Sequence, residues 1–291
     1  MNSGGLIRSL LSHIKCRNID YPNKNGKKIE RFPVPDDKVS WNTEWIEYSP
    51  QEYTAIHAKG KSWSDPDIND PNFNPSWNKL DGNINRCSHM GEYNILNGYP
   101  LNPIGRTGLK GRGILGRWGP NHAADPIVTK WKRDKNNSII YDDESKKPIL
   151  QFIAIKRKDC NEWAIPGGMV DPGEIVSQTL KREFFEEALN FIEMNDNEKV
   201  NITNYLNKFF SKGTEVYRGY VDDIRNTDNS WMETVAQNFH DEDGSLLEKL
   251  CLKAGDDAKD VVWTDISKNL QLYASHSDFI KLVVEKHNSH W

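Results

Sequence analysis

Three glutamates and one arginine lie close together in the run Arg182-Glu183-Phe184-Phe185-Glu186-Glu187. An α-helix turns about once every 3.6 residues, so the positions i, i+3 and i+4 held by Glu183, Glu186 and Glu187 share one helix face. Carboxylates crowded on one face repel each other unless a cation lies between them. Ligands that are all oxygen suit a hard cation, so the spacing predicts a site for Mg²⁺ or Mn²⁺.

The residues before this run extend the pattern, with Gly168 and Glu174 at fixed distances ahead of Arg182. The whole spacing resembles the signature of the Nudix hydrolases, which cleave nucleoside diphosphates linked to another group. The alternative from the residues alone is a solvated acidic helix face, stabilised by basic residues at helical spacing. Many signatures of the family continue with a glycine, where this chain has Ala188-Leu189-Asn190. That glycine concerns the end of the helix, so the departure bears on the subfamily and not on the metal ligands.

The resemblance implies an α/β fold, the Nudix α/β/α sandwich with a mixed sheet. It also implies catalysis with metal held by Glu183, Glu186 and Glu187. Arg182 is expected to lock one carboxylate by a bidentate contact and to hold the glutamates in register, the alternative being a plain surface ion pair. Glu174 either fixes the turn before the helix or reaches a second metal through water.

Six segments resemble one branch of that superfamily, the mitochondrial-type ADP-ribose pyrophosphatases of animals, and the resemblance runs over about residues 32 to 291. They are Gly116–Pro126, Ala164–Glu174, Leu180–Phe184, Glu186–Asn190, Arg225–Asn229 and Leu272–His276. The same domain occurs fused to melastatin-type TRP cation channels, where it senses ADP-ribose. Sensors that have lost catalysis replace the Glu-Phe pair after the arginine and one later glutamate, whereas this chain keeps all of these residues.

The closer resemblance therefore implies Mg²⁺-dependent hydrolysis of ADP-ribose to AMP and ribose 5-phosphate. Two alternatives stay open. One is an ADP-ribose-binding sensor module with little or no turnover. The other is a Nudix hydrolase of another nucleoside diphosphate derivative, such as a dinucleotide or a sugar nucleotide.

Four residues are expected to bind the substrate, because the corresponding positions contact the ligand in the related domains: Asp223, Arg225, Tyr273 and His276. Arg225 suits a phosphate, Asp223 suits ribose hydroxyls, and the Tyr273 ring suits stacking on adenine. For His276, a structural role and a ligand role are equally expected. Ile224 stands where the family usually has proline, which leaves the local turn less rigid.

The general base is not part of the signature. Glu233, at the start of an expected strand, is one candidate, and the acidic turn Asp241-Glu242-Asp243 is the other. Either group can equally be an ordinary charge without a catalytic role, and for the acidic turn this is the favoured interpretation.

Composition narrows the class of protein further. The net charge of −4 gives no sign of a nucleic-acid surface, and no apolar run is long enough to span a bilayer. The four cysteines are widely spaced, which favours a reducing compartment. Arg8, Lys15 and Arg17 lie in a first segment without acidic residues, where Leu6, Ile7, Leu10, Leu11 and Ile14 can share one helix face. This segment is either a transit peptide or a frayed tail, so we expect the protein to be cytoplasmic or mitochondrial. We also expect it to be a monomer.

The chain divides by composition into three parts: a tail and linker over residues 1–30, a loop-rich α+β cap domain over 31–125, and the Nudix domain over 126–291. We expect the cap domain to cover the active-site cleft. Within it, the glycine-rich run 105–116 either approaches a phosphate or packs tightly against other segments. In the Nudix domain, strands are expected at 126–132, 149–155, 216–221, 234–239 and 261–263, and another strand is expected to end in a turn within 163–168. Helices are expected at 203–210 and 278–286.

Overall fold

The computed structural model describes residues 13–22, 28–158, 160–189, 196–244, 252, 254 and 258–291. The chain forms two compact units. The first contains Met1–His122 together with two later segments, Val170–Glu174 and Gly219–Thr234. The second contains Ala123–Met169, Ile175–Arg218 and Val235–Trp291. Two of the expected substrate-binding residues, Asp223 and Arg225, therefore fold with the N-terminal part of the chain.

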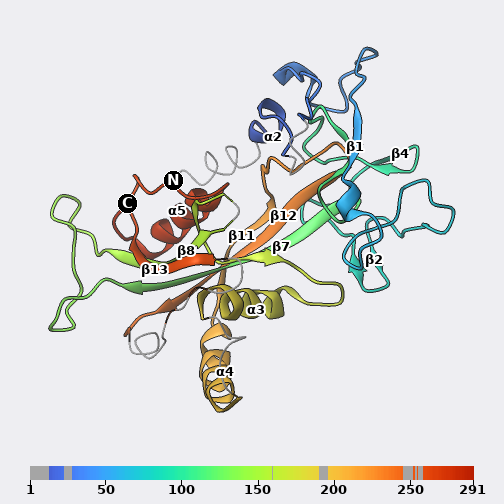
Figure 1. Ribbon diagram of the computed structural model, residues 1–291. Coiled ribbons are helices and arrows are strands. Elements are labelled where there is room, and N and C mark those ends of the chain that lie inside the picture. Colours follow the sequence, from blue (N-terminus) through green and yellow to red (C-terminus); the bar gives the residue numbers. More distant parts are fainter. Residues whose placement is uncertain are drawn as a thin grey trace. The chain divides into compact units, whose positions relative to one another are not determined.

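A seven-stranded sheet carries the second unit, and its main path runs in the order β11-β12-β7-β8-β13 (Figure 1). Strand β8 is antiparallel to both of its neighbours on this path, pairing Phe152 with Thr129 on one side and Ile155 with Val261 on the other. The two short strands β9 and β10 pair with β8 and β7. The strands are β7 (Gly119–Trp131), β8 (Leu150–Arg157), β9 (Trp163–Ala164), β10 (Gly168–Met169), β11 (Thr214–Tyr220), β12 (Ser230–Asp241) and β13 (Ala258–Asp265).

Helices cover both faces of this sheet (Figure 1). Helices α3 (Val176–Ala188) and α4 (Asp196–Phe210) lie on one face and α5 (His276–His287) on the other. Successive residues of β12 show the alternation that makes this possible. Phe239 joins the apolar core with Phe184 of α3, while its neighbour Asn238 contacts the ring of His287 in α5 at 2.7 Å. The expected α/β architecture with a mixed sheet is confirmed.

The first unit consists mostly of loops and short elements. Its apolar clusters are small, one around Tyr21 and Leu109 and one around Tyr220 and Trp231. Buried polar groups connect its segments, for example the Asp228 carboxylate, which accepts from Tyr48 and Thr107. The elements are α2 (Lys15–Asn18), η1 (Asp36–Lys38), β1 (Glu52–Thr54), η2 (Ile56–Ala58), β2 (Leu80–Asp81), β3 (Ile84–Asn85), β4 (Ile95–Leu96), β5 (Tyr99–Pro100) and β6 (Lys110–Gly113).

The glycine-rich run packs against the first unit's own backbone. At Gly105 and Gly108, whose φ angles are +131° and +84°, a β-carbon would overlap the carbonyl oxygens of Val39 and Phe32. Those φ values also favour glycine over any other residue. Of the two alternatives for residues 105–116, the structure supports tight packing.

The expectation of a frayed tail is wrong for the part of the N-terminal segment that the structure describes. His13 and Cys16 are completely buried, and the backbone N–H groups of Lys15 and Cys16 donate to the Asp222 carboxylate at 2.8 and 3.0 Å. Tyr21 pairs with Ile29 across the expected linker. Long-range packing of this kind leaves no local signal in the sequence. The expected helix face from Leu6 to Leu11 lies outside the described residues.

Most of the expected elements are present, with shifted ends. The helix expected from Thr203 begins at Asp196, and in the first unit the short β1 around Tyr53 is followed by a 3-10 turn. Strand β9 ends at Ala164, two residues before Pro166, because proline has no N–H for the ladder. Within the described residues, no helix has the length and apolar character needed to cross a bilayer.

Candidate active site

Helix α3 presents the glutamates because its other face is anchored in the core. Leu180, Phe184 and Ala188 follow each other at intervals of four residues and are all buried against the sheet. At the first turn, the Gln178 side chain accepts from the Ile175 backbone N–H at 3.2 Å. This contact satisfies one of the N–H groups that a helix start leaves without an intrahelical partner.

The glutamates differ in their exposure. Glu183 and Glu187 are 7% and 6% exposed, whereas the Glu186 side chain is 37% exposed. The Arg182 guanidinium joins two of them: Nη1 donates to Glu183 Oε1 at 2.8 Å and to Glu186 Oε2 at 3.2 Å. Its Nη2 also donates to the Met169 carbonyl at 3.0 Å, which ties the helix to β10. Arg182 thus bridges two carboxylates through one nitrogen, in place of the expected bidentate contact with one carboxylate.

The loop before β10 shapes the other side of the cluster. The Gly167 N–H donates to Glu187 Oε2 at 2.8 Å. Gly168 lies so close to Glu183 that a β-carbon would meet the carboxylate, with the Glu183 Cδ atom 2.5 Å away. The glycine that begins the signature is therefore needed for the room it leaves to Glu183. We call Arg182, Glu183, Glu186 and Glu187 the glutamate cluster.

Glu174 closes a turn within the first unit. Its Oε2 accepts from the Asp171 N–H at 3.1 Å, and its own N–H donates to the Asp171 carbonyl at 3.0 Å. This geometry agrees with the first of the two roles expected from the sequence, that of fixing the turn before the helix.

The residues of the glutamate cluster fit a hard divalent cation. Carboxylate oxygens are the ligands that Mg²⁺ and Mn²⁺ prefer. Two of the carboxylates are buried, and a buried carboxylate is costly unless a positive charge accompanies it. Arg182 supplies one positive charge to three negative ones, so the cluster keeps a negative balance that a divalent cation would neutralise.

Tyr273 and His276 lie together in the second unit, with ring centroids 5.8 Å apart. His276 Nδ1 accepts from the Ile165 N–H at 2.9 Å, and Nε2 lies 3.9 Å from Asp125 Oδ1. The Arg157 guanidinium lies 4.6 Å from the centroid of the Tyr273 ring. Because Nδ1 accepts this hydrogen bond, a neutral His276 ring carries its proton on Nε2. The same hydrogen bond attaches His276 to the loop that contains Ile165.

Asp223 and Arg225 form an ion pair within the first unit. Arg225 donates through Nε and Nη2 to the two oxygens of Asp223 at 2.8 and 2.6 Å. Asp223 is 4% exposed, while the Arg225 side chain is 28% exposed. The sequence proximity of the two residues gives this bidentate fork, which fixes the direction of the guanidinium.

Glu233 has surroundings that the sequence did not indicate. It is fully buried in the first unit, where Ser88 Oγ and Trp231 Nε1 donate to Oε1 at 2.5 and 2.7 Å and the His89 N–H donates to Oε2 at 2.6 Å. His122 Nε2 lies 3.8 Å from Oε2. Burial and the three hydrogen-bond donors both disfavour proton transfer from water to the Glu233 carboxylate. These surroundings argue against Glu233 as the general base, and that role stays a prediction.

The acidic turn is the other candidate base. In the second unit, Glu242 Oε1 accepts from Trp131 Nε1 at 2.9 Å and Oε2 lies 3.1 Å from His240 Nε2. Burial lowers the pKa of His240, although the neighbouring Glu242 carboxylate opposes that effect. These contacts fit the structural role that was favoured for this turn.

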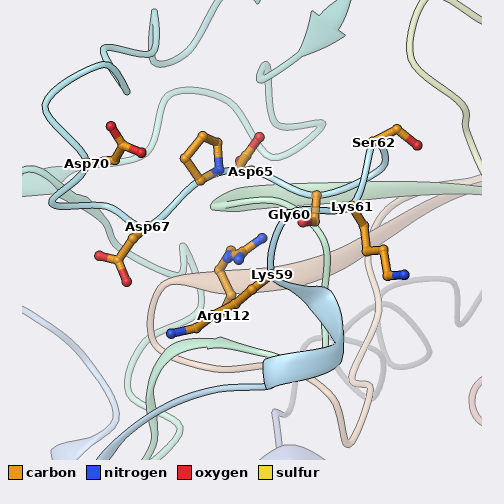
Figure 2. Close-up of a pocket in the computed structure, with 10 residues that line it drawn as sticks. Lys59, Gly60, Lys61, Ser62, Asp65, Asp67, Asp70 and Arg112 are labelled. Atoms are coloured by element: carbon orange, nitrogen blue, oxygen red, sulfur yellow. The ribbon is translucent and has the colours of Figure 1, made fainter.

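A cavity of about 610 Å³ lies in the first unit, beside η2 and β6 (Figure 2). Arg112 lines it and is 1% exposed; its Nη1 donates to the Gly116 carbonyl at 2.6 Å. Burial lowers the pKa of Arg112. Asp65, also at the cavity, is already paired with Arg86 at 2.8 Å. Arg112 belongs to the glycine-rich run 105–116, whereas none of the residues expected to act in catalysis or to bind ADP-ribose lines this cavity.

Comparison with known proteins identifies two family domains along the chain. The model of the NUDIX domain matches residues 133–283, and that of the NUDT9-like N-terminal domain matches residues 34–119. The chain is 58% identical to a mitochondrial ADP-ribose pyrophosphatase of Rattus norvegicus over 96% of its own length and 80% of that protein. It is 51% identical to a putative nudix hydrolase 6 of Caenorhabditis elegans, over 95% of this chain and 98% of the relative.

A third relative is of another kind. Transient receptor potential cation channel subfamily M member 2 of Mus musculus is 37% identical over 96% of this chain, which corresponds to 18% of the channel. The chain belongs to the Nudix hydrolase family and is an enzyme of that family. It carries a NUDT9-like N-terminal domain ahead of its Nudix domain, and members of the family generally require a divalent metal ion.

Proposed function

We propose that this protein hydrolyses ADP-ribose to AMP and ribose 5-phosphate with Mg²⁺. The observation that carries the proposal is the complete glutamate cluster on α3, with Arg182 between Glu183 and Glu186 at 2.8 and 3.2 Å. The named activity of the Rattus norvegicus relative, 58% identical over most of both chains, supports the choice of substrate.

In this mechanism Glu183, Glu186 and Glu187 would hold the metal, which would supply positive charge against the diphosphate and lower the pKa of bound water. Arg182 keeps Glu183 and Glu186 in register, and the Gly167 N–H fixes the direction of Glu187. Each of these contacts reduces the reorganisation needed when charge develops on the reacting phosphate.

Substrate binding is assigned to Asp223, Arg225, Tyr273 and His276, as expected from the resemblance. For Arg225, two nitrogens already donate to Asp223, so the fork orients the guanidinium for a phosphate. The Tyr273 ring offers a face for a base, although Arg157 lies 4.6 Å from its centroid and competes for it. Substitution of each residue with a measured KM tests these roles one at a time.

The test of the activity is a substrate panel. Purified protein with Mg²⁺ is given ADP-ribose, a dinucleotide and a sugar nucleotide, and the products are separated by chromatography. We expect AMP and ribose 5-phosphate from ADP-ribose at the highest kcat/KM. A higher kcat/KM for another member of the panel would replace ADP-ribose as the substrate.

The alternative is an ADP-ribose sensor, which is supported by the matched channel of Mus musculus. Binding without turnover would establish it. The variant Glu187→Gln is the matched control, because it is expected to lose hydrolysis and to keep binding of the nucleotide. If wild-type protein and Glu187→Gln both bind ADP-ribose and neither releases AMP, the protein is a sensor of ADP-ribose and does not hydrolyse it.

We place the protein in mitochondria, because the Rattus norvegicus relative is described as mitochondrial and the first segment is basic without acidic residues. A processing site must then precede His13, since His13 and Cys16 are buried in the fold. Mass measurement of the N-terminus of protein isolated from mitochondria checks this. A mature N-terminus beyond Cys16, or a cytosolic protein, would contradict it. A monomer without nucleic-acid partners stays a prediction, tested by sedimentation.

A further inference from the structure

Two histidines and a glutamate from three distant segments meet in the first unit. His89 follows strand β3, His122 lies in β7 and Glu233 lies in β12. One ligand atom from each lies within 4.8 Å of the other two. The two imidazole rings have centroids 4.8 Å apart, and His122 Nε2 is 3.8 Å from Glu233 Oε2. We call these three residues the histidine cluster.

The carboxylate of the cluster is held in one orientation. Ser88, Trp231 and the His89 backbone donate three hydrogen bonds to it, between 2.5 and 2.7 Å long. Donors of this kind are the usual outer contacts of a carboxylate that binds a metal, because they fix its direction before the metal arrives. Oε2 accepts one of the three bonds and is also the oxygen that faces His122.

The charge of Glu233 also calls for a cation. All three groups that donate hydrogen bonds to Glu233 are neutral. Within the described part of the chain, the side chain that can form an ion pair with Glu233 is that of His122. Complete burial of a carboxylate is strongly unfavourable unless positive charge compensates it. A cation between the imidazoles and Oε2 would supply that compensation.

The donor set selects the kind of cation. Two imidazole nitrogens and one carboxylate oxygen suit Zn²⁺ and similar transition metals, whereas the all-oxygen glutamate cluster suits Mg²⁺. Metal–ligand bonds of about 2.1 Å in a tetrahedral site place ligand atoms roughly 3.4 Å apart. The 3.8 Å contact is close to that value, and the other separations between the ligand atoms are at most 4.8 Å.

We propose that His89, His122 and Glu233 form a second metal site, which binds a Zn²⁺-class transition metal and is distinct from the glutamate cluster on α3. Three protein ligands leave the fourth position of a tetrahedral site open to water or to another ligand. This is the arrangement of a reactive or exchangeable site more than of a closed structural one. The proposal does not depend on which diphosphate the enzyme hydrolyses.

Metal titration of the full chain tests the proposal. The protein is stripped with a chelator and titrated with Zn²⁺, and with Co²⁺ as a spectroscopic probe, in excess Mg²⁺ that occupies the glutamate cluster. We expect one equivalent of Zn²⁺ to bind, and a Co²⁺ spectrum of mixed nitrogen and oxygen ligands. His89→Asn and His122→Gln are each expected to weaken Zn²⁺ binding at least about tenfold, since even loss of an outer contact costs 10- to 100-fold.

Two control variants identify the site. His57→Gln removes an exposed histidine of the same unit, and Glu187→Gln alters the glutamate cluster; both are expected to keep wild-type Zn²⁺ affinity. Circular dichroism and thermal melting show that each variant is folded. Because His89 is a half-buried loop residue, His89→Asn remains informative if His122→Gln does not fold. Unchanged Zn²⁺ affinity in folded His89→Asn, or loss of Zn²⁺ binding in Glu187→Gln, would overturn the proposal.

Discussion

The glutamate cluster and the histidine cluster are built in opposite ways. The first comes from six consecutive residues of one helix, where periodicity alone places the carboxylates on a common face. The second takes single residues from a loop and two strands that lie far apart in the chain. The glutamate cluster has a local guanidinium to balance part of its charge, while Glu233 is held by neutral donors. A site built within one helix can be recognised by spacing, and a site assembled by topology cannot.

The largest expected effect is a loss of catalytic activity when a residue of the glutamate cluster is substituted. Glu187→Gln or Glu186→Gln should lower kcat/KM for ADP-ribose at least about a hundredfold, because loss of a ligand exceeds the 10- to 100-fold cost of losing an outer contact. Steady-state kinetics with varied Mg²⁺ measure it. Glu215→Gln, on the exposed part of β11, is the matched control. Near-normal turnover with intact fold would place the catalytic metal elsewhere.

The second effect concerns stability at the histidine cluster. Glu233→Gln should lower the free energy of unfolding by about 2 kcal/mol. Whichever way the new amide turns, its NH₂ group faces an N–H donor, either the His89 backbone or the Trp231 indole.

Chemical denaturation of Glu233→Gln, in the absence of transition metals, measures this cost. Glu52→Gln, at an exposed position of the same unit, is the control. Equal unfolding free energies for wild type and Glu233→Gln would show that the three donors do not hold the carboxylate.

The third effect returns to the glutamate cluster and tests the glycine that begins the signature. Gly168→Ala should lower kcat/KM about tenfold and raise the Mg²⁺ concentration needed for half-maximal rate, because the β-carbon would displace the Glu183 carboxylate. Met169→Ala, in the same strand and with an exposed side chain, is the control. Wild-type Mg²⁺ dependence in Gly168→Ala would mean that Glu183 moves aside without cost to the metal site.

The smallest expected effect is a pH-dependent change in stability that His13 causes. The hydrogen-bond partners of His13 are neutral, whereas His122 lies near the Glu233 carboxylate. His13 contacts the Tyr220 hydroxyl at 2.6 Å and the Arg106 carbonyl at 3.0 Å. Its pKa is lowered to about 4, mainly because burial removes the water that would solvate the imidazolium, and the nearby Asp222 carboxylate offsets only part of this. The charges of Arg17 and Arg31 add to the lowering.

The sign of the pH effect follows from these values. The unfolded chain binds the proton near pH 6.5 and the folded chain near pH 4, so this contribution to stability is complete above pH 6.5 and is lost as the pH falls toward 4. Between pH 7 and pH 6 the loss is about 0.7 kcal/mol. Unfolding free energies of wild type and His13→Gln over this range measure it, with His57→Gln as control. Parallel pH profiles for wild type and His13→Gln would contradict it.

Much of the second unit could be predicted because its signals are local. Alternating apolar residues indicated the strands, and Leu180 and Phe184, four residues apart in the sequence, are both buried on one face of α3. The ends of elements were less certain, as at β9, where Pro166 stops the ladder. The first unit gave weaker signals because its short segments are joined by buried polar contacts, such as those of Asp228 and Asp65. The contact of Asp228 with Thr107 joins residues 121 positions apart, and that of Asp65 with Arg86 joins residues 21 positions apart.

By itself, the sequence identified the four residues of the glutamate cluster and the family, and it predicts a hard cation for three carboxylates on one helix face. Helical periodicity is a property of neighbouring residues, so spacing was sufficient. The tertiary structure alone decided that Arg182 bridges Glu183 and Glu186, that Gly168 leaves room for a carboxylate, and that Glu233 lies buried beside His89 and His122. Those relations depend on how distant segments pack, and burial sets the energetic value of every charge among them.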